Sequence, residues 1–66
     1  MDKIRISIII KSMLNDAMIE VNDLKSMDAA QERLRFVKYL VHMFPDTTTG
    51  VDIDTVYEQF KLIDIK

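Results

Sequence analysis

The side chains best suited to chemistry in this 66-residue chain are its one histidine and the cations that precede it. Arg35, Lys38 and His42 follow each other at spacings of three and four residues, so a helix would place them on one side. Cations in such a row neutralise phosphates, which makes a dimeric nucleic-acid-binding regulator one hypothesis. We favour a solvated helix face instead, because the row is short and the segment after it is acidic.

The same search gives little support for catalysis or for metal binding. No serine or threonine is spaced to act as a nucleophile beside His42. The acidic segment that starts at Asp46 resembles a calcium loop only superficially, because Tyr57 stands where the bidentate glutamate is required. The chain also has no cysteine. We therefore predict a non-catalytic protein without a metal ion or a cofactor.

Arg33 is a charge that we expect inside the fold. Helical periodicity points it toward the apolar side of its helix, one turn after the preceding connector. We predict an ion pair from Arg33 to Glu20 or Asp16, with the arginine stem packed on apolar neighbours. An exposed pair contributes less than ~1 kcal/mol, so its main role would be to set the register of two helices.

These groups need a scaffold, and the apolar stretch Lys3–Lys25 is its first part. Its apolar residues recur at spacings of three and four, which places them on one side of a helix. No glycine or proline interrupts the pattern, so we predict one long helix over the stretch, capped by Asp2. The stripe consists of Ile6, Ile9, Ile10, Met13, Leu14, Ala17, Val21 and Leu24.

A strand at the start of the chain is the alternative. The segment Ile4–Ile10 is rich in β-branched residues, and its first residues alternate between apolar and polar. The tail over residues 60–65 alternates as well. The two segments would then pair and give a small α+β fold of the order β-α-α-β.

The rest of the chain predicts two further helices. The second runs from Asp28 to Phe44 and ends before Pro45, since the residue before a proline avoids the α region. A third helix spans about Ile53–Ile63 and is capped by Asp52 or Asp54. The second helix should bury Ala29, Ala30, Val37, Leu40, Val41 and Phe44, with Leu34, Phe36 and Met43 at the margins of this face.

These patterns predict a single all-α domain over residues 1–66. A long N-terminal helix and a second helix form an antiparallel hairpin, because the connector between them is short. The second helix is the shorter one, so the hairpin leaves residues 4–10 without a partner. The short third helix or another subunit must cover them.

Composition indicates that the chain does not work alone. Apolar residues make up 48% of the sequence, while a chain of this length buries only about 60% of its unfolded surface. No disulfide stabilises it. A homo-oligomer, in the simplest case a dimeric helical bundle, would bury the excess apolar surface.

The surplus apolar residues suggest where a partner binds. Ile4, Ile8 and Ile19 lie off the main stripe of the first helix, and Leu62 and Ile65 lie in the tail. Isoleucine is a poor choice for a face that meets only water. We therefore expect a small adaptor, inhibitor, assembly factor or accessory subunit that binds another protein through these residues.

The sequence also bears on location. No run approaches the ~20 apolar residues of a membrane span. The early apolar run is broken by Ser7 and ended by Lys11, and no small-residue cleavage site follows. We expect a cytoplasmic protein that does not bind membranes.

Overall fold

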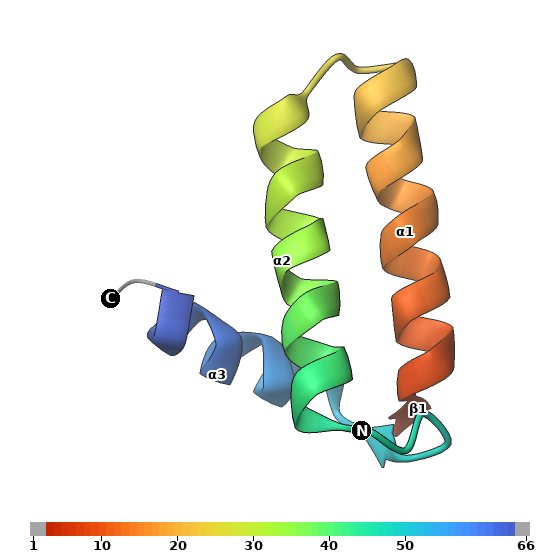
Figure 1. Cartoon of the computed structure of the whole chain (residues 1–66), viewed down its shortest axis with the longest axis vertical. Coiled ribbons are helices and arrows are strands. Elements are labelled where there is room, and N and C mark those ends of the chain that lie inside the picture. The colour runs from red at the N-terminus through yellow and green to blue at the C-terminus, as the bar shows by residue number, and fades with distance from the viewer. Residues whose placement is uncertain (1–2, 65–66) are drawn as a thin grey trace.

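The computed structural model describes residues 3–64 and contains three helices (Figure 1). Two of them form an antiparallel hairpin, and the third lies beside the base of the second and points away from the first. This confirms the predicted all-α fold, although the first two helices are equal in length at 17 residues. The elements are β1 (Ile4–Arg5), α1 (Ile6–Asn22), α2 (Met27–Met43), β2 (Gly50–Val51) and α3 (Ile53–Asp64).

The first helix begins at Ile6 rather than at Lys3, because a short strand precedes it. β1 pairs antiparallel with β2, and Ile4 lies opposite Val51. The β-branched side chain of Ile4 suits this extended backbone. The prediction of a helix over the whole stretch is therefore wrong at its start, and the strand alternative is right only for Ile4 and Arg5.

The loop before β2 explains where α1 starts. The first N–H groups of a helix have no partner within it. Here the N–H of Ile6 donates to the carbonyl of Thr49 and the N–H of Ser7 donates to that of Thr47, both at 2.9 Å. These two bonds replace a side-chain cap, and the cap expected from Asp2 lies outside the described residues.

The predicted strand over residues 60–65 is wrong as far as the structure describes it. Residues 60–64 belong to α3, and Ile65 lies outside the described part. The helical conformation is favoured over a strand because it places Val56 and Phe60, four residues apart, together in the core. The carboxylate of Asp52 caps α3 as predicted, since its Oδ1 accepts a bond from the N–H of Asp54 at 3.1 Å.

The connection between α1 and α2 reverses the chain within a few residues. The N–H of Ser26 donates to the carbonyl of Glu20 at 2.8 Å. Lys25 has φ of 54°, in the left-handed region where a Cβ atom is unfavourable. The second helix then begins at Met27, one residue before the predicted Asp28.

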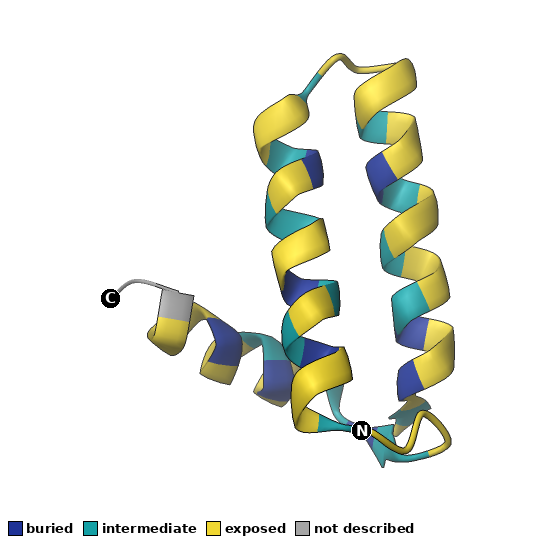
Figure 2. Cartoon of the chain, in the orientation of Figure 1, coloured by how far each residue is buried: buried dark blue, intermediate teal, exposed yellow. Residues whose placement is uncertain are grey.

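The main core lies between the base of the hairpin and α3 (Figure 2). It buries Ile6 and Ile9 of α1 among residues of α2, β2 and α3. The first turns of α1 were predicted to lack a partner in the hairpin, but α2 itself supplies part of their cover. The buried cluster consists of Ile6, Ile9, Phe36, Leu40, Val51, Val56 and Phe60.

The buried face of α2 is turned toward α3 relative to the prediction. Phe36 is only 1% exposed, whereas Val41 is 54% exposed. The cause is α3, which brings the rings of Tyr57 and Phe60 to centroid distances of 5.1 and 5.2 Å from Phe36. Aromatic packing of this kind adds to the burial of apolar area. The expectation that Phe36 lies at the margin and Val41 in the core is therefore wrong.

Replacing Lys25 with glycine is expected to raise the free energy of unfolding by about 0.5–1 kcal/mol. Glycine adopts the left-handed conformation without the Cβ clash, although it also makes the unfolded chain more flexible. Urea unfolding at fixed protein concentration, followed by circular dichroism, measures the change. The matched control Lys11→Gly, at an exposed position inside α1, should lose about 1 kcal/mol. Equal losses in both variants would contradict the role of the left-handed backbone.

Candidate functional site

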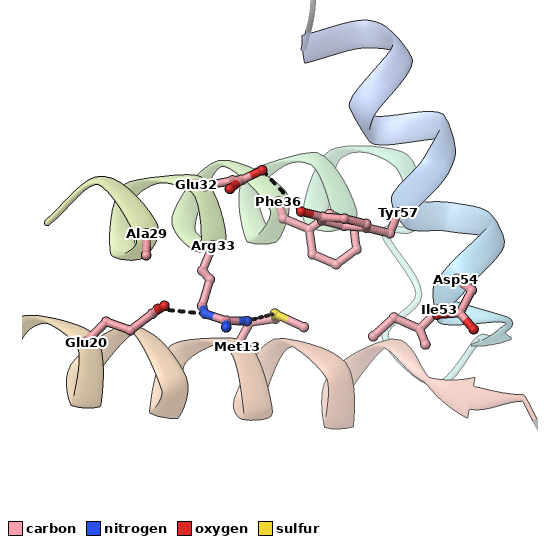
Figure 3. A pocket seen from close by; sticks show the side chains of 9 residues that line it. All are labelled: Met13, Glu20, Ala29, Glu32, Arg33, Phe36, Ile53, Asp54 and Tyr57. Carbon is pink, nitrogen blue, oxygen red and sulfur yellow. Dashed lines mark hydrogen bonds and ion pairs between the residues drawn. The ribbon is translucent and has the colours of Figure 1, made fainter. Parts of the chain in front are cut away.

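A cavity of about 310 Å³ lies between the hairpin and the start of α3 (Figure 3). Side chains from all three helices line it, and its apolar part includes Phe36 and Met13. Its polar part is formed by Glu20, Glu32, Arg33, Asp54 and Tyr57. The dashed contacts in Figure 3 show that several of these polar groups bind each other.

Arg33 joins the two helices of the hairpin at this cavity. Its Nε donates to Oε1 of Glu20 at 2.6 Å, and its Nη1 lies 3.7 Å from Oδ2 of Asp16. The same Nη1 is 3.5 Å from the sulfur of Met13. The predicted ion pair is confirmed. Because the Glu20 side chain is only 13% exposed, the pair holds a partly buried carboxylate in place.

Glu32 joins α2 to α3 in a similar way. Its Oε1 accepts a bond from the Tyr57 hydroxyl at 3.1 Å and lies 3.0 Å from Nζ of Lys61. The ammonium of Lys61 and the hydroxyl of Tyr57 lower the pKa of Glu32 below its ordinary value of 4.5. The same pairing raises the pKa of Lys61.

The chemistry available at this cavity is that of structural ion pairs. A carboxyl group that acts as a general acid near neutral pH needs a raised pKa, and that of Glu32 is lowered. His42 is exposed on α2 and does not line the cavity. Among residues 3–64, no three histidine, cysteine or acidic side chains gather to hold a metal ion. We therefore assign these pairs to the fold.

The residues predicted to bind a partner lie on several separate surfaces. Ile8 is 56% exposed and Ile19 is 42% exposed, but about 16 Å of α1 separates them. Leu62, at 70% exposed, lies on α3. Ile4 is half-buried in β1 and packs against the core. Ile65 is outside the described residues.

A different apolar surface, which the sequence analysis missed, runs along the hairpin. Leu14, Met18 and Val21 follow each other on α1 at spacings of four and three, which places them on one side of the helix. Leu14 and Val21 belong to the apolar stripe predicted to face the core, yet both are exposed. Leu34 and Val41 are exposed on α2, where the spacing of seven also repeats one side. We call these five residues the open face.

The open face lies on the side of the hairpin away from α3. On α1, Leu14 follows Met13, which lines the cavity, so the two point about 100° apart. On α2, Leu34 and Val41 lie across the helix from Phe36, which packs against α3. The sequence did contain a signal for the open face, namely the breadth of the apolar stripe on α1. One neighbouring helix and a short third element cannot cover all of that stripe.

The basic row lies at a second, shallower groove. Arg35, Lys38 and His42 are exposed on α2. Together with Tyr39 of α2 and Phe60 and Ile63 of α3, they line a space of about 520 Å³. The apolar wall was not foreseen, because the sequence does not show which side of α2 the third helix takes.

None of the helices in the described part of the chain is long and apolar enough to cross a membrane.

The pair between Glu32 and Lys61 should make stability depend on pH in the acid range. A lowered pKa in the folded state contributes stability that is present above the ordinary pKa and is lost as the pH falls through the lowered one. Glu32→Gln should therefore unfold at lower urea than the wild type at pH 7, and the difference should shrink at pH 3. The control Asp23→Asn, at an exposed carboxylate at the end of α1, should show no such difference. A gap for Glu32→Gln that is constant with pH would contradict the pairing.

Comparison with known proteins adds no relative. No protein-family model, no curated protein and no solved structure matches the chain. The candidate surfaces are therefore argued from the geometry of the chain itself, and these are the open face and the groove beside the basic row.

Proposed function

We propose that the protein is a non-catalytic helical module that binds another protein and works as a homo-oligomer. The observation that supports the binding of another protein is the open face. Its five apolar side chains are between 36% and 62% exposed and form one row on each of the two packed helices. Contiguous apolar patches on small proteins mark interaction sites.

The energetic case rests on what the chain leaves uncovered. Fully burying a side chain such as leucine or valine contributes about 1.5–3 kcal/mol. In the described part of the chain, the buried cluster of the core contains only seven residues. The free energy of unfolding is therefore small, and apolar surface that stays in water contributes nothing to it. A partner that covers the open face would add stability of the size that small domains need.

The shape of the open face indicates the kind of partner. Two antiparallel helices present parallel rows of apolar side chains, and a helix packs on such a surface at an axial distance of roughly 8–10 Å. Lys11 lies one turn before Leu14, and Lys38 lies between Leu34 and Val41. The partner that fits is an amphipathic helix with acidic residues beside its apolar stripe. An adaptor, inhibitor, assembly factor or accessory subunit would use such a contact.

The homo-oligomer is tested by sedimentation velocity over micromolar to high micromolar concentrations. We expect a species larger than the monomer whose share grows with concentration. A compact, folded monomer throughout this range would show that the chain does not self-associate.

The open face is tested with Leu34→Glu, which places a carboxylate among its apolar side chains. Binding of an acidic amphipathic helix should weaken at least tenfold, because the new charge must lose its water and also repels the partner. The matched control is Gln59→Glu, which adds the same charge at an exposed position on α3, away from the open face. Proteins captured from an extract of the native cell should be retained by the wild type and the control and lost from Leu34→Glu. Equal retention by all three would remove the open face from the proposal.

A further inference from the structure

The C-terminal half of α3 carries apolar side chains that nothing in the chain covers. It projects away from the hairpin (Figure 1), and Leu62 and Ile63 are 70% and 57% exposed. Glu58 lies one turn before Leu62, on the same side of the helix. Lys61 is bound to Glu32, and no other described residue pairs with Glu58. The outer side of α3 therefore combines the carboxylate of Glu58 with the exposed side chain of Leu62, while Ile63 lies toward the groove.

The groove beside α3 has the opposite charge. Its apolar wall is formed by Tyr39, Phe60 and Ile63, and Arg35 and Lys38 are basic side chains of its lining. Lys38 and His42 stand along its edge without a pairing partner in the described part of the chain. The groove thus offers cations beside apolar rings, which complements the outer side of α3.

Because α3 forms one wall of this groove, the outer side of α3 and the groove belong to one surface. Two copies of this surface can bind each other. We infer that a second copy of the chain occupies the groove, and that the α3 helices of the two copies pack beside each other around a two-fold axis. In such an interface every contact occurs twice, so Glu58 of each copy meets the basic row of the other. Leu62 and Ile63 are then covered by the partner's α3 and groove. The inference rests on the proposed function, which requires self-association but does not say through which surface.

Charge also decides against the open face as the self-association surface. Its nearest charged neighbours on both helices are lysines, Lys11 and Lys38. Two copies packed face to face would bring like charges together, which disfavours a complex. The surface around α3 carries both signs, so it suits a second copy, and the open face stays available for a different protein.

Nucleic acid fits this surface less well than a second copy does. A phosphate backbone in the groove would neutralise the basic row, but it would leave Leu62 in water. A second copy satisfies both the charge and the exposed apolar groups.

The test is a charge exchange between two variants of the full chain. Glu58→Lys places two cations opposite each other in the homodimer, and Lys38→Glu places two carboxylates opposite each other. Each variant alone should raise the dimer dissociation constant at least tenfold in sedimentation velocity. An equimolar mixture restores both opposite-charge contacts, so it should form a heterodimer about as tight as the wild-type dimer, with its mass confirmed by native mass spectrometry.

Two controls separate this interface from other surfaces. Lys11→Glu changes the charge by the same amount on α1, away from the groove, and Met18→Glu disrupts the open face on the same helix. Both should keep the wild-type dissociation constant. All four positions are exposed, and circular dichroism checks that each variant folds.

The possible results are distinct. A wild-type dimer that neither variant weakens, or that mixing does not restore, would overturn the interface while the homo-oligomer stands. A wild-type monomer would overturn the homo-oligomer itself. Binding of a short DNA duplex at low salt that Lys38→Glu abolishes, with self-association unaffected by Glu58→Lys, would assign the groove to nucleic acid instead.

Discussion

The packing of Phe36 against the aromatic residues of α3 is the contact on which the rest of the structure depends. It draws α3 to one side of the hairpin, where Tyr57 and Phe60 reach Phe36. The loop that leads to α3 also supplies the carbonyls that start α1. Because the chain has a single short third helix, covering one side of the hairpin leaves the other uncovered. The exposure of Leu14 and Val41 is a direct result of this choice.

The ion pairs fix the register and orientation of the helices more than they add to the free energy of unfolding. Each pair is at least partly solvated, and such pairs contribute little net free energy. Arg33 lies between Glu20 and Asp16, one turn apart on α1, so it favours one register of the hairpin. Lys61 ties α3 to α2 through Glu32. Because Lys61 pairs with Glu32, Glu58 has no partner in the described part of the chain. The contact that orients α3 therefore also leaves an unpaired carboxylate on its outer side.

Local sequence patterns were enough to predict the elements, and they failed where distant segments decide. The end of α2 before Pro45 and the cap at Asp52 follow from short-range spacing and were predicted. The pair of Arg33 with Glu20 was predicted from the short connector, which fixes the two helices as antiparallel neighbours. The start of α1 was not, because it depends on carbonyls about 40 residues later in the chain. The choice between Phe36 and Val41 for the core also could not be made. A broad apolar stripe allows several rotations of the helix, and only the position of α3 selects one.

The same asymmetry gives the protein two apolar surfaces of different electrostatic character. The open face has lysines as its nearest charged neighbours, while the surface around α3 combines Glu58 with the basic row. Apolar contact alone would let either surface bind to any other, because the hydrophobic effect has no direction. Opposite charges placed beside one surface, and like charges beside the other, separate self-association from binding of a second protein. A chain this small can therefore direct two partners to different surfaces. A few exposed charges are enough, because the core fixes the orientation of the helices that carry them.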